Sequence, residues 1–308
     1  MHCLVLGGLG FIGSHIVEAL VTRGHKVRIF DLPNITTLNL SRCIDSVEII
    51  GGDFSNIHDI DNALEGTDII IHLAWTTLPG PSNGNPIYDT ESNVVGTLKI
   101  LEKAIQKQIK KVIFASSGGT VYGVARELPI PETHQTNPIC SYGITKLTIE
   151  KYLALYHTLY NLNYTILRLG NAYGERQRTE SVQGAVAVFL GRTLLGQPIT
   201  IWGDGSVARD YLYISDFVSA FLAVIEHDTG SRIYNIAGGQ ASSLNDILSL
   251  IHQVTGRKPE VKYEPSRKLD VPVNCLDIRR AYNELNWRPE TNLKEGLRRT
   301  WEWLKTSQ

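Results

Sequence analysis

The chain has 308 residues, of which 43% are hydrophobic, and a formal net charge of −1 at pH 7. Such a chain is long enough for about two domains with substantial cores, and without an extended basic run it is not expected to bind nucleic acid or an anionic membrane surface. No apolar stretch approaches the roughly 20 residues of a membrane-spanning helix, and the apolar N-terminus is too short for a secretory signal. The cytosol is the expected compartment.

The cysteines and histidines give no sign of a disulfide framework or a metal site. The four cysteines are Cys3, Cys43, Cys140 and Cys275, far apart and without a C-x-x-C motif, so we expect them to be reduced. Cys140 precedes Tyr142 by two residues and either contacts a site there or acts as a small buried hydrophobe. The nine histidines lack ligand spacing, and no metal is predicted.

In the first half of the chain, short apolar runs alternate with longer amphipathic ones. Strands are predicted at residues 3–6, 27–30, 47–50, 69–73, 112–115 and 164–169, and helices at 13–23, 57–64, 89–106 and 142–160. Apolar runs between helices indicate parallel strands buried on both faces, and right-handed crossovers place helices on both sides of the sheet. The predicted fold class is α/β, with a Rossmann-like doubly wound parallel sheet.

Beyond residue 169 the predicted elements become shorter. Helices are expected at 183–195, 215–226, 244–254 and 293–304, and a strand at 199–202. We expect residues 1–169 to form a dinucleotide-binding domain and residues 170–308 a smaller α/β domain for substrate. A segment near 210–236 is expected to return to the first domain.

A glycine-rich turn joins the first predicted strand to the first helix. Gly7, Gly10 and Gly13 have G-x-x-G-x-x-G spacing, with Phe11 and Ile12 between the last two. Residues without side chains let a pyrophosphate approach the backbone N–H groups, and the helix N-terminus adds partial positive charge. This context favours a dinucleotide-binding loop over a purely structural turn.

Two acidic residues follow the next two predicted strands. Asp31 lies 18 residues after Gly13 (31 − 13), where a carboxylate accepts both hydroxyls of the adenosine ribose and repels a 2′-phosphate. No cation follows in the next three residues, so NAD rather than NADP is predicted; the alternative is a turn-forming aspartate. Asp53 either accepts from the adenine amino group or caps a helix.

Tyr142 and Lys146 lie four residues apart in a predicted helix and therefore share one face. A nearby cation favours phenolate and moves the tyrosine pKa from its ordinary value of about 10 toward working pH. Tyr142 is therefore the candidate general base. Together with the glycine loop, the pair indicates nicotinamide redox chemistry.

Several motifs occur together in one order along the chain. They are GGLGFIGSH at 7–15, IHLA at 71–74, NVVGTL at 93–98, SSGGTVYG at 116–123, Tyr142 with Lys146, and RLGNAYGERQ at 168–177. Through them the chain resembles the extended short-chain dehydrogenases/reductases, specifically the NAD-dependent nucleotide-sugar epimerases and dehydratases of the UDP-galactose 4-epimerase type. The resemblance implies a bound NAD that Leu73 and Ala74 also contact, and a homodimer packed through the helices at about 89–106 and 142–160.

In that family a Ser or Thr after the fifth strand acts with the Tyr and Lys. Ser117 precedes Tyr142 by 25 residues (142 − 117), a common family spacing, so the resemblance implies Ser117; Ser116 and Thr120 are the alternatives. Family dehydratases and decarboxylases carry acidic residues after this hydroxyl. Here Gly118 and Gly119 follow and cannot transfer a proton, which favours inversion at C4.

The resemblance also implies a UDP-sugar bound against the second domain. The residues that match the family's substrate contacts are Ser117, Asn171, Arg209, Arg267, Asp270 and Asn274. Guanidinium groups suit phosphate oxygens, although the two arginines could instead form surface ion pairs. Asn274 stands where some relatives have a bulky Tyr, so an N-acetylhexosamine would have room. The loop at 75–86 either covers the sugar or is a plain surface connection.

The function that the resemblance implies is a NAD-dependent 4-epimerase of a UDP-hexose, of the glucose, N-acetylhexosamine or uronate series. It would oxidise C4 transiently and return the hydride to the opposite face. The alternatives are a 4,6-dehydratase, a decarboxylase or a net oxidoreductase, and a non-catalytic NAD-binding sensor. The Tyr142 and Lys146 pair disfavours the sensor, since sensing requires no proton transfer.

Overall fold

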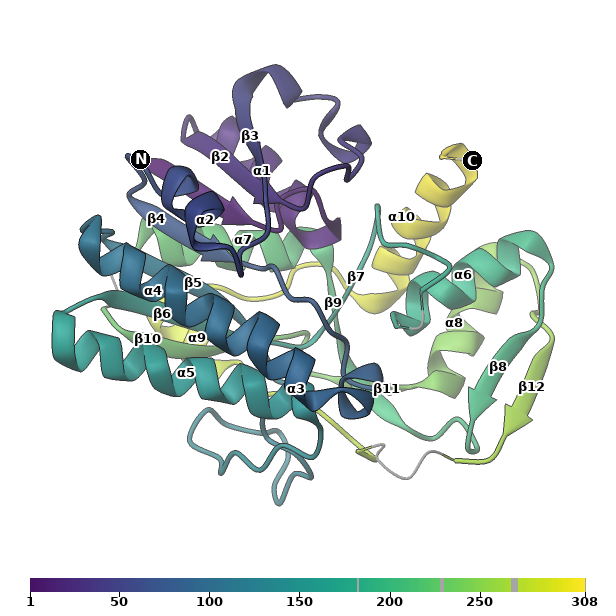
Figure 1. Cartoon of the computed structure of the whole chain (residues 1–308). Helices are drawn as coiled ribbons and strands as arrows, with labels where there is room; N and C mark the ends of the chain where they lie inside the picture. The colour runs from purple at the N-terminus through teal and green to yellow at the C-terminus, as the bar shows by residue number, and fades with distance from the viewer. Residues whose placement is uncertain (182, 228–229, 267–270, 308) are drawn as a thin grey trace.

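A seven-stranded parallel sheet dominates the computed structural model, which describes residues 1–181, 183–227, 230–266 and 271–307 (Figure 1). The strand order is β10-β6-β5-β4-β1-β2-β3. Its strands are β1 (His2–Leu6), β2 (Lys26–Asp31), β3 (Val47–Gly51), β4 (Ile69–His72), β5 (Lys111–Ser117), β6 (Asn163–Leu169) and β10 (Arg232–Ile236). The predicted α/β class and the strands predicted in the first half are confirmed.

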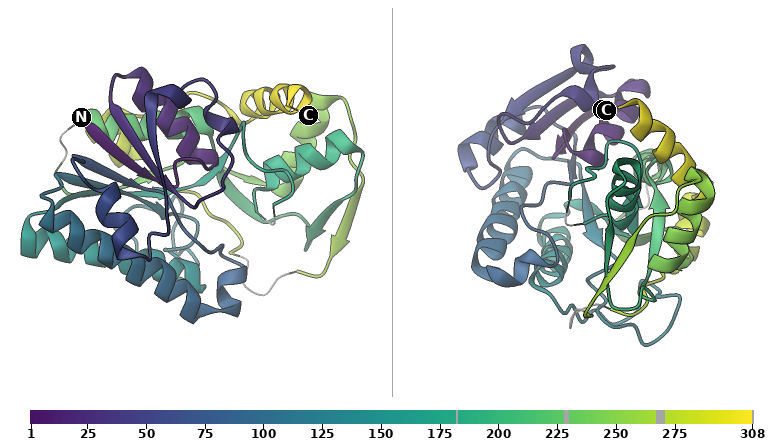
Figure 2. Two further views of the ribbon diagram at one scale, coloured as in Figure 1. Left: turned by 45° about the horizontal axis from the view of Figure 1, so that its top comes forward. Right: turned by 90° about the vertical axis from the view of Figure 1, so that its right-hand side faces the viewer.

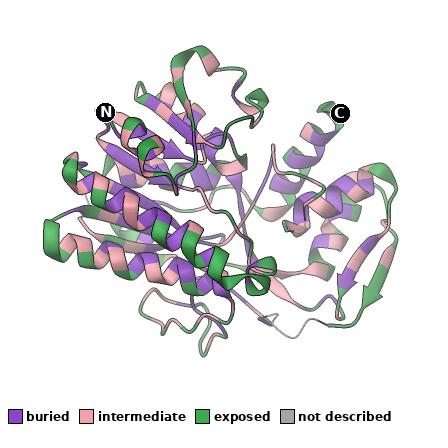
Figure 3. Ribbon diagram, viewed as in Figure 1, coloured by how far each residue is buried: buried purple, intermediate pink, exposed green. Residues whose placement is uncertain are grey.

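Helices pack on both faces of this sheet (Figure 2, left). Those on one face are α1 (Phe11–Thr22) and α7 (Ile214–Glu226), and those on the other are α2 (Ile57–Ala63), α4 (Gly96–Gln106) and α5 (Ser141–Tyr160). In β1, Cys3 and Val5 face the α1 and α7 core, whereas Leu4 and Leu6 face the α4 and α5 core. Because successive strand side chains point to opposite faces, an unbroken apolar run buries both faces. Figure 3 shows these central strands as largely buried.

One predicted helix is interrupted. The pattern at 89–106 predicts a continuous helix, but the chain forms α3 (Pro86–Asp89), a π-helical segment η4 (Thr90–Val95) and then α4. Asn85 caps α3 by accepting from the Tyr88 N–H at 3.1 Å, and the Asn93 carbonyl accepts from the Thr97 hydroxyl at 2.6 Å. Such π-turns often occur at functional sites.

The remaining strands form two small sheets, from the centre to the right of Figure 1, and the remaining helices and turns lie around these sheets or around the large sheet. The strands are β7 (Asn171–Tyr173), β9 (Ala208–Tyr213) and β11 (Ala241–Ser243) in one sheet, and β8 (Ile199–Trp202) and β12 (Val261–Glu264) in the other. The helices are α6 (Ala185–Leu195), α8 (Leu244–Thr255), α9 (Arg279–Leu285) and α10 (Leu293–Thr306), and the short 3₁₀ turns are η1 (Leu38–Leu40), η2 (Ile44–Ser46) and η3 (Pro81–Gly84). After α7 the chain returns to the large sheet, where β10 pairs with β6.

Within the described parts of the chain, no helix is both long and apolar enough to cross a membrane. Among the same residues, no three His, Cys, Asp or Glu side chains lie close enough to share a metal ion. The four cysteines are free thiols.

Candidate functional site

A cavity of about 960 Å³ lies at the carboxyl ends of β1, β4, β5 and β6. The opposite wall comes from β7, α6 and β9 of the smaller part. β1 lies between β4 and β2, so the chain leaves β1 in one direction and later returns on its other side. Parallel α/β sheets bind ligands at such a switch point. The position of the cavity is therefore a consequence of the strand order.

Most of the residues predicted for the site line this cavity. They are Gly7, Gly10, Phe11, Ile12, Gly13, Leu73, Ser117, Tyr142, Lys146, Asn171 and Arg209. Cys140 also lines it, as the first of its two interpretations predicts. Asp31, Asp53, Ala74 and Asn274 do not line it, and Arg267 and Asp270 fall in the segment 267–270, outside the described residues.

The glycine turn leaves no space for side chains. A Cβ on Gly13 would lie 2.1 Å from the Gly7 carbonyl oxygen, and Gly7 has a φ of +82°, which favours glycine. Gly10 is the N-cap of α1 and makes no side-chain capping bond. The first N–H groups of a helix have no partner within the helix. The turn therefore presents main-chain donors and a helix N-terminus to the cavity, as a pyrophosphate requires.

Asp31 connects the glycine turn to the end of β2. Its carboxylate accepts from the Leu9 N–H at 2.9 Å and from the Leu32 N–H at 2.9 Å. Burial raises the pKa of this carboxyl, against the lowering effect of the two N–H donors. Asp31 thus stabilises the local turn and also lies beside the glycine turn. Its interpretation as a turn-forming aspartate is therefore compatible with its interpretation as the acceptor of the ribose hydroxyls.

Asp53 is exposed and accepts from the Ser55 N–H at 2.8 Å. The N-cap of α2 is Asn56, which accepts from the His58 N–H at 3.1 Å. The helix-cap interpretation of Asp53 is therefore wrong, because the helix begins three residues later than that role requires. A contact between Asp53 and an adenine ring stays a prediction.

Lys146 is buried, with 2% of its surface exposed, and its ammonium points toward β5. The Nζ atom donates to the Ala115 carbonyl at 2.7 Å and lies 3.7 Å from the centre of the Trp75 ring. It lies 5.6 Å from the centre of the Tyr142 ring. The two residues do share a face of α5 toward the cavity, but the cation is directed at Ala115 and Trp75.

The expected lowering of the Tyr142 pKa is wrong for this structure. Burial raises the pKa of the phenol above its ordinary value, with smaller contributions from Cys140 and Asp89. Burial also lowers the pKa of Lys146 well below its ordinary value. The physical reason is desolvation, which disfavours the charged form of both groups. Additional positive charge is needed before Tyr142 ionises near neutral pH.

The three candidate hydroxyls have different surroundings. Ser116 donates to the Glu150 carboxylate, which forms a buried ion pair with Arg168 at 2.6 Å. Its hydroxyl therefore belongs to a structural network. Ser117 and Thr120 line the cavity, and the Thr120 hydroxyl is buried without a partner in the described part of the chain. These two remain open as the reacting hydroxyl.

Arg209, on β9, lies on the cavity wall formed by the smaller part of the molecule. Its Nη1 donates to the Val271 carbonyl at 2.6 Å and to the Ala208 carbonyl at 2.9 Å. Asn274 is buried behind the cavity floor and donates to the Gly118 carbonyl at 3.0 Å. A direct contact between Asn274 and a sugar therefore stays a prediction.

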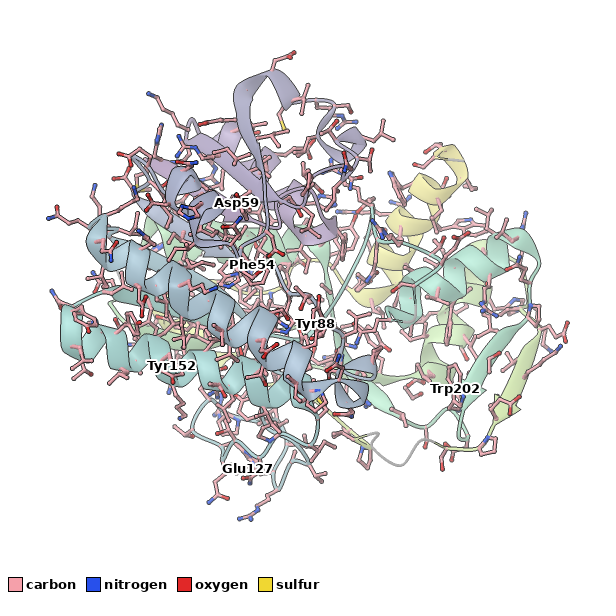
Figure 4. All side chains as sticks on the ribbon, in the orientation of Figure 1. Phe54, Asp59, Tyr88, Glu127, Tyr152 and Trp202 are labelled. Carbon is pink, nitrogen blue, oxygen red and sulfur yellow. The ribbon has the colours of Figure 1, made fainter. Side chains whose placement is uncertain are left out.

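The loop after β4 forms part of the cavity wall. The plain surface connection is wrong, because Ser82 is 1% exposed and Pro79, Gly80, Pro81 and Asn83 line the cavity together with Trp75. Figure 4 shows the nearby Tyr88 between the two parts of the molecule, with Trp202 far from it on β8. The run of Pro, Ser, Gly and Asn indicates a turn, but which helix it contacts is a long-range property that no local signal reveals.

The charged residues of the cavity are cations. In the described lining these are Lys146 and Arg209, and no carboxylate is among them. Cations suit the diphosphate groups of a dinucleotide and of a nucleotide sugar. Tyr142 and the hydroxyls of Ser117 and Thr120 are the proton-transferring groups available beside them.

Known proteins resemble this chain over its whole length. The family model described as the NAD dependent epimerase/dehydratase family matches residues 3–237. UDP-glucose 4-epimerase of Mycolicibacterium smegmatis is 33% identical over 312 residues, with 99% of each chain covered. The crystal structure of UDP-glucose 4-epimerase from Thermotoga maritima with UDP-glucose is similar with a TM-score of 0.95 at 36% identity, covering 100% of this chain and 99% of that one. The UDP-glucose 4-epimerase of Thermus thermophilus in complex with NAD is similar with a TM-score of 0.93 at 32% identity, with 100% of both chains covered.

Proposed function

Because this chain belongs to the NAD-dependent epimerase/dehydratase family, we propose that it inverts the configuration at C4 of a UDP-hexose. The observation that carries the proposal is the shared cavity. Ser117, Tyr142 and Lys146 line it with the glycine turn, and the described lining residues include no carboxylate. Epimerisation needs one group that takes a proton and returns it, whereas dehydration needs an additional acid. This supports the epimerase over the dehydratase.

The glycine turn and its surroundings support NAD as the cofactor. Gly7 and Gly13 leave room for a pyrophosphate, and Ala74 supports Gly7 from behind, since a Cβ on Gly7 would lie 3.0 Å from the Ala74 nitrogen. Leu73 contributes to the wall, and Asp31 is beside the turn, where it would accept the ribose hydroxyls. NAD, when bound, would accept a hydride from C4, return it, and add a cationic ring beside the site.

Tyr142 moves the proton in the proposed reaction. As phenolate it takes the proton of the C4 hydroxyl. After the keto sugar has rotated to present its opposite face, Tyr142 gives the proton back to the same oxygen. Ser117 steadies the hydroxyl, and Lys146 together with the cationic ring of a bound NAD would supply the positive charge that ionisation of the phenol requires. Asn171 and Arg209 are proposed to bind the diphosphate, which leaves the sugar free to present either face.

The assay uses purified protein with UDP-glucose, UDP-N-acetylglucosamine or UDP-glucuronate in ²H₂O, without added reductant. NMR would show a C4-inverted product with protium retained at C4, because the hydride that leaves the sugar also returns to it. Tyr142→Phe is the matched control. A 4-keto-6-deoxy sugar with solvent deuterium at C5 would instead identify a dehydratase and overturn the proposal. The substrate series is assigned by which of the three sugars turns over.

We further propose that the enzyme acts in the cytosol as a homodimer. The compartment is the one typical of the family to which the chain belongs. The dimer is supported by an apolar stripe on α5, where Ile144, Leu155 and Leu159 are 53%, 45% and 58% exposed. Exposed apolar side chains on one face of a helix are typical of a protein interface.

A further inference from the structure

A buried carboxylate that the proposed reaction does not use lies beside the start of α5. Asp89 is 0% exposed. Its Oδ1 accepts from the Thr77 hydroxyl at 2.5 Å and from the Asn93 amide at 2.9 Å. Its Oδ2 accepts from the Ser141 hydroxyl at 2.6 Å and lies 3.2 Å from the Thr145 hydroxyl, which shares its one proton between Asp89 and the Ser141 and Tyr142 carbonyls at 3.1 and 3.0 Å. These four partners are uncharged and come from the loop after β4, the π-helical segment and α5, so one side chain joins three segments.

The loop after β4 also caps α5 directly. The first N–H groups of a helix lack partners within the helix, and a side chain at the N-cap position commonly supplies one. Cys140, the N-cap of α5, makes no side-chain capping bond. Instead the Ser141 N–H donates to the Asn83 side chain at 2.9 Å, and the Tyr142 N–H donates to the Ser82 hydroxyl at 3.0 Å. α5 therefore begins on acceptors that the loop supplies.

These bonds surround Tyr142. Its own N–H is bound to Ser82, and Ser141 before it and Thr145 after it are both bound to Asp89. The same loop forms part of the cavity wall through its Pro79 to Pro81 turn. In Figure 1, α3, which ends at Asp89, lies against the start of α5. The phenol and the wall that faces it thus depend on one set of hydrogen bonds.

We propose that Asp89 is a positioning residue, which together with Ser82 fixes Tyr142 relative to the wall formed by the loop at residues 75–84. The inference rests on the proposed function for what Tyr142 does, whereas the coupling of the loop to α5 is independent of it. A carboxylate suits the position, because its two oxygens accept four bonds and its negative charge lies near the positive end of the α5 dipole.

The primary variants are Asp89→Asn and Ser82→Ala. Asparagine keeps the shape of the side chain and removes its charge, and alanine removes the acceptor for the Tyr142 N–H. Each has a matched control away from α5. Asp216→Asn changes another buried carboxylate, which accepts from the Thr291 N–H at 2.8 Å, and Ser243→Ala removes the cap of α8.

Two measurements test the positioning role. In steady-state kinetics by NMR, both primary variants should lose about tenfold to a hundredfold in kcat, because small displacements of a reacting group are costly. KM and NAD affinity should stay within about threefold. In amide hydrogen exchange followed by mass spectrometry, both should exchange faster at residues 76–84 and 140–146, whereas the controls should match the wild type there. Exchange does not depend on turnover, so it tests the coupling even if no UDP-sugar is epimerised.

The pH profile separates positioning from a general loss of stability. The groups that act on Tyr142 are Cys140 and Asp89, which both raise its pKa, and Lys146, whose Nζ lies 5.6 Å from its ring. Asp89→Asn should therefore move the acid limb of kcat/KM to lower pH, and Ser82→Ala should leave it in place. If Asp89→Asn does not fold, the Ser82→Ala kinetics and exchange carry the test alone. Unchanged exchange at 140–146, with kcat per folded protein within about twofold of wild type, would overturn the proposal.

Discussion

The ammonium of Lys146 lies 3.7 Å from the centre of the Trp75 ring. The same indole meets the Tyr142 ring edge-on, with 6.1 Å between ring centres. Burial lowers the pKa of Lys146, against the raising effect of the Asp89 and Glu150 carboxylates. The ring face and the Ala115 carbonyl are the groups in direct contact with the cation, and they replace part of the water that it loses. Trp75 therefore contacts both members of the pair that the sequence identified, and it helps to set where the cation lies.

This contact predicts an energetic coupling between Trp75 and Lys146. In the wild-type background, Trp75→Leu should lower the free energy of unfolding by about 1–2 kcal/mol more than Trp75→Phe, because only phenylalanine retains a ring face for the cation. In a Lys146→Met background the difference between the two should nearly vanish. Urea denaturation of the six proteins measures this. If Trp75→Leu and Trp75→Phe differ in unfolding free energy by the same amount in both backgrounds, the volume of the ring, rather than its contact with the cation, determines the loss of stability.

Removing the Tyr142 hydroxyl should abolish turnover without releasing the cofactor. Tyr142→Phe is expected to reduce kcat by about 10²–10⁴-fold or more, since general acid–base catalysis contributes about this much, while NAD affinity changes by less than about threefold. NMR turnover and calorimetric NAD titration are the measurements. Tyr263→Phe, on the exposed strand β12, is the control and should behave as wild type. Full activity in Tyr142→Phe would refute the assignment.

Gly13 should tolerate no side chain. In Gly13→Ala the new methyl would lie 2.1 Å from the Gly7 oxygen and 2.7 Å from the Gly8 Cα, so the turn must open. We expect NAD affinity to fall by about a hundredfold or the melting temperature to drop by several degrees, as overpacking commonly costs about 1–3 kcal/mol. In the control Gly84→Ala the methyl meets no atom within 4 Å, and both quantities should stay unchanged. Wild-type NAD affinity together with an unchanged melting temperature in Gly13→Ala would contradict the tight turn.

Asp210 should make stability depend on pH between about 4 and 7. Its buried carboxyl accepts from the N–H groups of Gly238, Gly239 and Leu276 at 2.7, 3.2 and 3.0 Å, and burial nevertheless raises its pKa from 3.8 to about 7. The folded protein therefore binds the proton more tightly than the unfolded chain does. This contribution to stability is complete below about pH 4 and is lost as the pH rises through about 7.

The test of this pH dependence is Asp210→Asn. The variant should be less stable overall by about 1–3 kcal/mol, because an amide offers one acceptor oxygen where the carboxyl offers two. Its unfolding free energy should vary less between pH 4 and 7 than that of the wild type. If the unfolding free energies of the variant and the wild type change equally with pH across this range, Asp210 does not titrate there.

The stripe on α5 predicts self-association. Leu155→Glu places a charge among apolar side chains of the proposed interface and should convert the dimer to monomer in sedimentation velocity experiments at micromolar concentration. Leu38→Glu, at a site that is 79% exposed on η1, should remain dimeric. A monomeric wild type would show that the protein does not form the proposed dimer. A dimeric Leu155→Glu would show that the interface does not include this face of α5.

The sequence alone determined the parts of this protein that depend on neighbours along the chain. The alternating apolar runs specified the strands of the first half and its helices, apart from the π-helical segment at 90–95, because a side-chain period of 2.0 or 3.6 is a local property. The spacing of Gly7, Gly10 and Gly13 likewise specified the turn, and the four-residue spacing of Tyr142 and Lys146 specified their common face.

Only the tertiary structure decided which groups those residues meet. Ser82 and Tyr142 are 60 residues apart and share a hydrogen bond, and Ser116 is bound to Glu150, 34 residues away. The Lys146 ammonium lies 3.7 Å from the centre of the Trp75 ring and 5.6 Å from that of the Tyr142 ring. The direction of the Tyr142 pKa shift was also beyond sequence reasoning, because burial dominates it. Hydrogen-bond partners and desolvation depend on how distant segments pack, and no periodicity or spacing along the chain encodes that arrangement.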